Sequence, residues 1–353
     1  MRRSLSLLAV VGASLFAQDP SPGTWKFAVA GDSRNCGDVV MPAIASGVMR
    51  NRAEFYWHLG DFRAIYTFDE DLVPPKQLQL PTKPLNISNY ELGAWPDFIA
   101  HQLAPFRTLP VFLAIGNHET IPPMTRERYL TQFADWLETP AVRNQRLADD
   151  PQDHALHTYF HWVSHNIDFI ALDNASEDQF DSQQLKWFHT LIDRDEASSQ
   201  IRTIVVGMHA ALPGSFGKNH SMSDWAQGEK SGREVYTALW HAQATAHKRV
   251  YVLASHSHFY MEDVYRTDDW RDQVLPGWIV GTAGAVRYRL PPGANSGRTA
   301  MTDVYGYMIG TVAPDASISF SFQKLMIDDL FRANQGKLPE PLVHWCFDEN
   351  KQM

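Results

Sequence analysis

Five short segments of the chain place residues that can bind metal ions or transfer protons directly after an apolar run. The segments are VAGDSR, YWHLGDF, FLAIGNHE, IVVGMH and VLASHSH, and they supply Asp32, Asp61, Asn117, His118, His209, His256 and His258. Carboxylate and amide oxygens combined with imidazole nitrogens suit Zn, Mn or Fe better than Ca or Mg. A carboxylate shared by two such ions forms a two-metal centre, which can bind a phosphate group and activate water.

Each segment taken alone has a purely structural explanation. An aspartate after a glycine is usually a turn residue, and His209 alone could be a hydrogen-bonded core histidine. The HSH pair is more specific, because two imidazoles on one extended segment can both reach a metal cluster. It does not match the HxHxDH pattern of metallo-β-lactamase-like hydrolases, since Tyr260 and Met261 replace the Asp and the last His of that pattern. The combination of segments is therefore what indicates a site.

The elements that must position these residues are strands of an α/β fold. Each of the five apolar runs has strand length, is rich in Val, Ile and aromatics, and ends in Gly or a polar residue. Helix-like segments lie between them, at residues 39–53 and 181–195. The site residues all follow the C-terminal ends of strands, which is where ligands bind in open α/β sheets.

Three longer segments separate the motifs. Residues 67–106 contain six prolines, which disfavour regular structure, residues 120–155 are charged and partly helical, and residues 213–232 are rich in Gly and Ser. All three follow strand ends that carry site residues, so they either form the walls of the site or are plain surface loops. Residues 305–322 alternate and predict a closing hairpin, whereas the polar tail, residues 328–353, has no evident role.

The composition favours one compact catalytic domain, residues 18–327, with these segments as insertions. The chain has 353 residues, of which 44% are hydrophobic and 20% charged, and no low-complexity tract interrupts it. The net charge is −9, and the sequence contains no extended run of Lys and Arg residues. Both features argue against binding to a nucleic-acid backbone. A phosphate substrate remains compatible, because bound metal ions dominate the local field.

The first 17 residues have the layout of a secretory signal peptide. Arg2 and Arg3 precede an apolar stretch that ends in Ala17, a small residue suited to cleavage. This predicts a secreted or periplasmic protein; the alternatives are a buried N-terminal helix or a membrane anchor. No other stretch is long and apolar enough to cross a membrane, so we expect no span after removal of the signal.

Cys36 and Cys346 are the two cysteines of the chain. They could pair in an oxidising compartment. The commoner role of such a residue is to be small and buried, and Cys36 is also a candidate metal ligand beside Asp32. The sequence leaves these alternatives open.

The ordered motifs GDSR, GDF, GNHE, GMH and SHSH resemble those of the calcineurin-like metallophosphoesterase superfamily. The resemblance spans about residues 25–325 and includes the NIDFIALDN strand and the QLKWF helix of its secreted members. It implies a four-layer fold in which helices flank a central β-sandwich. It also implies a dinuclear centre of Mn, Fe or Zn that hydrolyses phosphate esters.

The resemblance further implies a role for each site residue. Asp61 would bridge two metals, one held with Asp32 and His258, the other with Asn117, His209 and His256. His118 would stand beside the leaving-group oxygen as a proton donor or electrostatic stabiliser.

The chain departs from the family at its first motif, where Arg34 replaces a histidine ligand. A guanidinium does not ligate metals, but its geometry suits two phosphate oxygens. Arg34 therefore binds substrate, which we favour, or marks a weakened site with only one metal. Purple acid phosphatases also lack this histidine, but they have a tyrosine ligand three residues after the bridging aspartate. Ala64 stands there and Tyr66 comes two places later, so we predict no tyrosinate ligand and no purple colour.

Two functions follow as hypotheses. The first is an exported phosphoesterase that hydrolyses a small phosphomonoester or phosphodiester; the sequence does not choose between them and indicates no oligomeric state. The second is a catalytically quiet metal- or phosphate-binding protein with the same fold. Only the exchange at Arg34 supports the second, and the presence of His118 argues against it.

Overall fold

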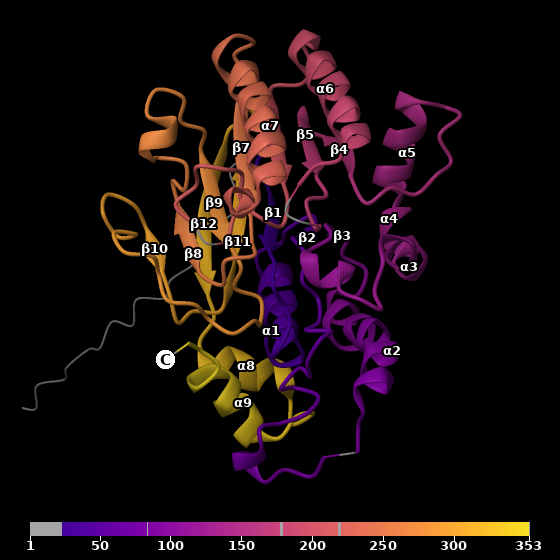
Figure 1. Cartoon of the computed structure of the whole chain (residues 1–353), viewed down its shortest axis with the longest axis vertical. Helices are drawn as coiled ribbons and strands as arrows, with labels where there is room; N and C mark the ends of the chain where they lie inside the picture. The colour runs from indigo at the N-terminus through magenta and orange to yellow at the C-terminus, as the bar shows by residue number, and fades with distance from the viewer. Residues whose placement is uncertain (1–22, 83, 177–178, 218–219, 353) are drawn as a thin grey trace, which may run out of the picture.

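The computed structural model describes residues 23–82, 84–176, 179–217 and 220–352. Two β-sheets pack face to face, and helices cover their outer faces (Figure 1). The predicted signal peptide, residues 1–17, lies outside the described residues. Among the described helices, none combines the length and the hydropathy that a membrane span requires.

The first sheet has five strands in the order β12-β11-β1-β2-β3. Its three parallel strands carry the first three motifs, and an antiparallel hairpin completes it as the alternating pattern predicts. The strands are β1 (Trp25–Ala30), β2 (Tyr56–His58), β3 (Val111–Leu113), β11 (Gly306–Val312) and β12 (Ile318–Lys324).

The second sheet has seven strands in the order β10-β8-β9-β7-β6-β5-β4. Its four parallel strands are β5 (Ile167–Ala171), β6 (Thr203–Gly207), β7 (Arg249–Ala254) and β9 (Gly277–Val280). The antiparallel strands are β4 (Phe160–Ser164), β8 (Tyr260–Glu262) and β10 (Ala300–Met301).

Aromatic side chains fill the space between the sheets. Phe27 of β1 meets Phe169 of β5 edge-on, with ring centroids 5.2 Å apart. Phe112 of β3 stacks on Trp162 of β4 at 3.9 Å, and Trp57 of β2 meets the same indole at 5.2 Å. Rings of this size bury large apolar areas and prefer these stacked and edge-on arrangements, so they set how the sheets face each other.

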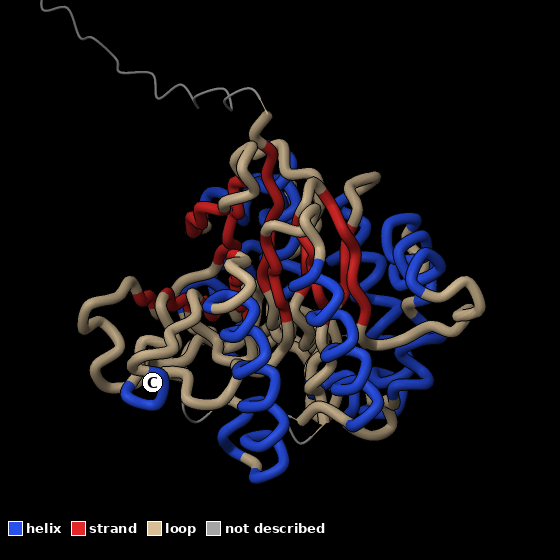
Figure 2. Tube along the Cα trace, turned by 90° about the horizontal axis from the view of Figure 1, so that it is seen from above, coloured by secondary structure: helices blue, strands red, loops and turns tan. Residues whose placement is uncertain are grey.

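The outer faces of the sheets are covered by helices, which include the two predicted ones, α1 (Gly37–Arg50) and α6 (Ser182–Ala197), and also α7 (Ala226–Ala244). Successive side chains of a strand point to opposite faces, so Ile204 and Val206 of β6 pack under α6 and α7, while Val205 faces the other sheet. On the first sheet, α1 packs with Met41 sulfur 3.8 Å from the Tyr56 hydroxyl. The strands thus lie in the middle with helices around them (Figure 2), and the predicted four-layer sandwich is confirmed.

The proline-rich segment contains a helix that the sequence analysis did not expect. α2 (Ile87–Phe98) begins where the Asn86 side chain accepts a hydrogen bond from the Asn89 amide, and it continues past Pro96 into a π-helical turn. Tyr90, Ala94, Trp95 and Phe98 are buried on one face. The expectation of irregular structure is wrong here, because a cap and an apolar face outweigh one proline near the end of the helix.

The other two segments are partly helical. Residues 120–155 contain α3 (Arg126–Gln132), α4 (Ala134–Leu137) and α5 (Pro140–Asp149), whereas α7 already begins at Ala226 inside the segment 213–232. The remaining short helical turns are η1 (Lys76–Leu78), η2 (Ile99–Leu103), η3 (Ala104–Phe106), η4 (Asn117–Thr120), η5 (Met222–Asp224) and η6 (Asp268–Trp270).

The C-terminal tail folds into α8 (Ile327–Asn334) and α9 (Glu340–Asp348), which lie beside α1 in Figure 1. A disulfide joins Cys346 of α9 to Cys36, directly before α1. Cys36 is therefore neither a free buried thiol nor a metal ligand. Of the alternatives that the sequence left open, the disulfide is the one observed, because the fold brings together two residues separated by 310 positions.

Loss of this disulfide is expected to lower the stability of the protein. Cross-linking so large a loop restricts the unfolded chain, and removal of a native disulfide typically costs about 2–5 kcal/mol. Guanidinium unfolding of a Cys36→Ala/Cys346→Ala variant should show a lower midpoint, while metal content stays unchanged because Cys36 supplies no ligand. An unchanged midpoint would mean that the bond does not contribute to stability.

Candidate metal centre

The ends of five strands bring the predicted ligands into two groups that share Asp61. One group consists of Asp32, Asp61 and His258, and the other of Asp61, His209 and His256. Within each group the candidate ligand atoms all lie within 4.8 Å of one another. Asn117 joins the second group through its side-chain oxygen, which lies 2.9 Å from His209 Nε2. The residues are thus placed together as the sequence analysis expected.

The backbone is distorted at three of these residues. Asp32, Asp61 and His256 adopt left-handed φ angles of 61°, 62° and 62°. Such a conformation costs a non-glycine residue about 1–3 kcal/mol and persists where the surroundings require it, commonly at functional sites. Here it turns each side chain into the centre directly after a strand or turn.

Two glycines allow the second and third motifs to approach closely. A Cβ on Gly60, whose φ is +92°, would lie 2.5 Å from the Gly116 nitrogen, and one on Gly116 would lie 2.4 Å from Asp61 Oδ1. No side chain fits in either place. The glycines of GDF and GNHE are therefore required for Asp61 and Asn117 to share one site.

In the second group, His209 Nε2 lies close to other atoms that have lone pairs. His209 Nδ1 lies 2.9 Å from the Leu59 carbonyl, and a proton on Nδ1 leaves Nε2 to face the centre. His209 Nε2 lies 3.2 Å from Asp61 Oδ1 and 2.9 Å from His256 Nδ1. Burial lowers the pKa of His209, but attraction by Asp61 outweighs it and raises this pKa to about 10. The carboxylate of Asp61 therefore favours a positive charge at His209 Nε2, which a metal ion would supply in place of that proton.

The first group contains carboxylate oxygens without hydrogen-bond partners. Asp32 Oδ1 and Asp61 Oδ2 are buried and accept no hydrogen bond from the part of the chain that the structure describes. His258 Nε2 lies 3.2 Å from Asp32 Oδ1, and its Nδ1 lies 2.7 Å from the Val286 carbonyl. Unpaired buried carboxylate oxygens are costly, and a bound cation would compensate them. This donor set fits a transition metal.

Arg34 is buried at the edge of the first group. Its Nη2 lies 3.3 Å from His258 Nε2 and donates to the Tyr288 hydroxyl at 3.4 Å, while its Nε lies 3.7 Å from Asp61 Oδ2. Burial lowers the pKa of Arg34, but attraction by Asp61 outweighs it, so the pKa lies above its ordinary value and the charge is retained. A fixed positive charge thus stands beside the first metal site.

His118 lies next to both groups without belonging to either. Its Nδ1 lies 2.7 Å from the Ala64 carbonyl, its Nε2 lies 3.6 Å from Asp61 Oδ2, and its backbone amide donates to Asp61 Oδ1 at 3.0 Å. Burial, reinforced by Arg34, lowers the pKa of His118 despite the attraction of Asp61. The side chain is therefore positioned to accept or donate a proton at Nε2.

Two supporting residues were missed in the sequence. The Glu119 carboxylate accepts hydrogen bonds from the backbone amides of Gly116, Asp61 and Phe62, and so ties the GDF and GNHE turns together. Glu119 belongs to a recognised motif, so its position was a usable signal. Tyr288 stacks on His258 with ring centroids 3.9 Å apart, but nothing in its sequence surroundings distinguishes it.

A third group of possible ligands, Asp38, Asp97 and His101, has a different explanation. The buried guanidinium of Arg63 contacts Asp38, Asp97 and Asp71. These carboxylates already surround a cation that belongs to the chain. Because Arg63 comes two residues after Asp61, the cluster anchors the loop that carries the shared ligand.

Comparison with solved structures identifies proteins of the same fold. PhoD superposes with a TM-score of 0.51 and 15% identity, covering 87% of this chain and 73% of that one. The purple acid phosphatase PPD1 from seeds of yellow lupin (Lupinus luteus) superposes with a TM-score of 0.55 and 14% identity, covering 92% of this chain and 56% of the lupin chain. The chain thus spans just over half the length of the lupin protein. No protein-family model and no curated protein sequence matches it.

Proposed function

We propose that this chain, which has the fold of PhoD and of purple acid phosphatase, is an exported metal-dependent hydrolase of phosphoric esters. The observation that carries the proposal is the pair of ligand groups that share Asp61. A two-metal hydrolytic centre needs a carboxylate that is shared by two groups of oxygen and nitrogen ligands. Export rests on the predicted signal peptide alone.

The proposed ligands divide between the groups as the motifs imply. Asp32, Asp61 and His258 would hold one ion of Mn, Fe or Zn, and Asp61, Asn117, His209 and His256 would hold the other. Transition metals bound here would make water a nucleophile at neutral pH and neutralise charge on the phosphoryl oxygens.

The other side chains bind and orient the substrate. The charged fork of Arg34 would donate hydrogen bonds to two phosphate oxygens beside Asp61. The lowered pKa of His118 favours the neutral ring, with Nδ1–H held by the Ala64 carbonyl, so Nε2 would first take up a proton from water and then give it to the leaving-group oxygen. Leu59 and Val286 carbonyls hold His209 and His258 in the tautomer that a ligand requires.

The competing hypothesis is a catalytically inactive protein that binds metal or phosphate, and one contact favours it. Arg34 Nη2 lies 3.3 Å from His258 Nε2, a nitrogen that the first metal would need. In that case the guanidinium replaces the ion, and the centre holds one metal or none. Metal content and turnover measured on one sample separate the two functions.

The test uses the protein from Gln18 onward, stripped of metal and reloaded with Mn or Zn. Nitrophenolate release from nitrophenyl phosphate and from bis-nitrophenyl phosphate is followed, and the metal content is determined on the same sample. Turnover that requires metal is the expected result, and the preferred ester distinguishes a monoesterase from a diesterase. Bound metal without turnover of either ester would favour the quiet binding protein.

Arg34→Ala is expected to lower kcat/KM about 10- to 100-fold, mainly through KM, because a charge-assisted pair of hydrogen bonds to phosphate is lost. Metal content should remain the same. Arg271→Ala, which removes an exposed arginine, is the matched control and should change neither quantity. If Arg34→His instead raises both the metal stoichiometry and turnover, Arg34 marks a weakened metal site and not a substrate contact.

A further inference from the structure

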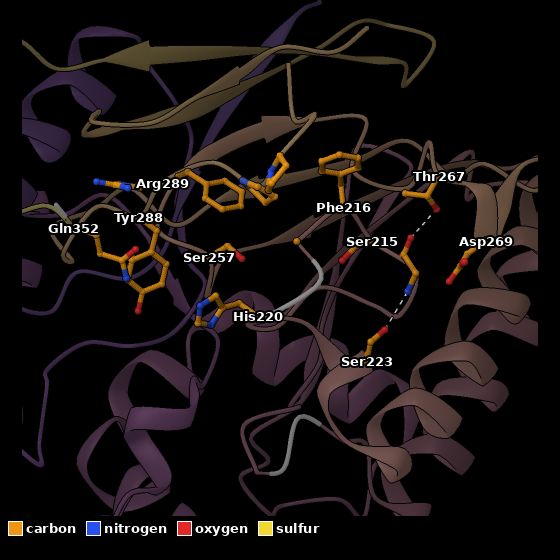
Figure 3. Close-up of a pocket in the computed structure, with 15 residues that line it drawn as sticks. Ser215, Phe216, His220, Ser223, Ser257, Thr267, Asp269, Tyr288, Arg289 and Gln352 are labelled. Carbon is orange, nitrogen blue, oxygen red and sulfur yellow. Dashed lines mark hydrogen bonds between the residues drawn. The ribbon is translucent and has the colours of Figure 1, made fainter. Parts of the chain in front are cut away.

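Figure 3 shows the residues that line a cavity of about 560 Å³, which lies next to the two ligand groups. Its wall includes His220 and Tyr288, and these residues also touch the ligands. The His220 ring lies 5.3 Å from that of His256, and the Tyr288 ring stacks on His258 at 3.9 Å. A phosphate held at the metal centre would therefore have the cavity directly next to it. A volume of this size suits an organic group of drug-like dimensions.

Aromatic rings and prolines form the apolar part of a lining that is otherwise polar. Besides His220 and Tyr288, it includes Phe216, Phe259 and two consecutive prolines, Pro291 and Pro292. The Arg298 guanidinium lies over the Phe216 ring, 3.9 Å from its centroid, and helps to hold that ring in place. Aromatic walls of this kind favour a planar ring, through stacking or edge contacts, over a flexible alkyl chain.

Two buried hydroxyls in the wall lack partners. Ser215 and Ser257 are 5% and 0% exposed, and neither Oγ forms a hydrogen bond with any described residue. A Cβ on Gly217 would lie 3.2 Å from Ser257 Oγ and 3.9 Å from Ser215 Oγ, so both hydroxyls lie on the same side of this glycine, and all three residues line the cavity. An unpaired buried hydroxyl is unfavourable, and a ligand with donors or acceptors at its edge would satisfy it.

The charges around the cavity do not select an ionic ligand. Asp269 lies at the wall but pairs with Arg233 at 3.1 Å, and Arg289 on another part of the wall is exposed to solvent. The two residues are of opposite sign. An uncharged group is therefore the better match to the interior.

We infer that this cavity binds the organic part of the substrate, and that this part is an uncharged aromatic ring with hydrogen-bonding groups at its edge. The inference rests on the proposed ester hydrolysis at the metal centre. The substrate is then a phosphate ester whose organic part contains such a ring. Ser215 and Ser257 bind the polar edge of the ring, and Phe216 and its neighbours enclose the faces.

The test compares probes that differ only in the ring. Adenosine 5′-monophosphate and ribose 5-phosphate contain the same primary alkyl phosphate, so the reactivity of the ester is equal in both. The metal-loaded protein is expected to hydrolyse the nucleotide with a kcat/KM at least about tenfold higher, because stacking and one or two hydrogen bonds are added. Calorimetric titration with adenosine, which has no phosphate, should show binding, whereas ribose should not bind.

Ser215→Ala tests the hydroxyl contact. Because Ser215 Oγ has no partner in the described chain, its removal should leave the melting temperature unchanged or raised. The dissociation constant for adenosine should rise about 3- to 10-fold, while kcat/KM for ribose 5-phosphate stays the same. Ser319→Ala, at an exposed serine of β12, is the control and should alter none of these values.

The outcomes separate this inference from the proposed function. Equal hydrolysis of both phosphates without adenosine binding overturns the ring site but leaves the phosphoesterase in place. Adenosine binding that weakens in Ser215→Ala, without hydrolysis of either phosphate, supports the ring site and contradicts the proposed function. Neither binding nor hydrolysis overturns both.

Discussion

Asp61→Asn is expected to empty both metal sites and to lower turnover of nitrophenyl phosphate by about a thousandfold or more. Asp61 is the residue that both ligand groups share, and an amide in its place has one uncharged oxygen, which cannot bridge two ions or offset their charge. Asparagine is the informative replacement because it tolerates the left-handed backbone, with a φ of 62°, that Asp61 adopts. Its side-chain oxygen can still accept the His118 amide, as Asp61 Oδ1 does.

The measurement is the number of metal ions per chain, determined together with turnover on the same preparation. Asp315→Asn is the matched control, because Asp315 lies on the surface and pairs with Arg249, and it should change neither value. A variant that keeps two metals per chain would falsify the bridging role. Loss of one ion alone would assign Asp61 to a single site.

The fold was predictable because the strands carry two independent signals. Each is a short apolar run, and each ends in the residues that the site uses. The HSH segment illustrates this: β7 ends at Ala254, and His256 and His258 follow at once into the two groups. The C-terminal ends of parallel strands lie at one edge of the sheet. Residues that follow these strand ends are therefore expected to lie close together in space.

The packing around the site could not be predicted in the same way. Tyr288 stands in a loop after β9, and its contacts with Arg34 and His258 depend on segments more than 25 residues away in sequence. The cavity beside it has the same origin, because Ser215 and Ser257 meet only after β6 and β7 have paired. Sequence spacing contains no information on such contacts, which are set by tertiary packing.

One local expectation failed and one question stayed open. The six prolines in residues 67–106 predicted irregular structure, yet Asn86 caps α2 and the buried face of the helix packs Trp95 and Phe98 against the core. The pairing of Cys36 could not be decided from the sequence, because its partner lies 310 positions away on a helix of the tail. Composition and periodicity contain no information on a partner so far along the chain.

His118→Asn is expected to keep both metals and to lower turnover by about a hundredfold or more for an ester with a poor leaving group. The residue lies outside both ligand groups, and its Nε2 is 3.6 Å from Asp61 Oδ2. A proton donor matters most when the departing oxygen is strongly basic. The loss should therefore be large for phenyl phosphate and much smaller for nitrophenyl phosphate, whose leaving group needs little protonation.

This dependence on the leaving group separates proton donation from a structural role. His118 also positions a loop, because its Nδ1 bonds to the Ala64 carbonyl, so a fall in turnover alone would not identify the cause. A residue that only holds the loop would lower the rates of both esters by the same factor. Loss of metal from His118→Asn would instead make His118 a ligand. Unequal losses with unchanged metal content are the combination that assigns the proton to His118 Nε2.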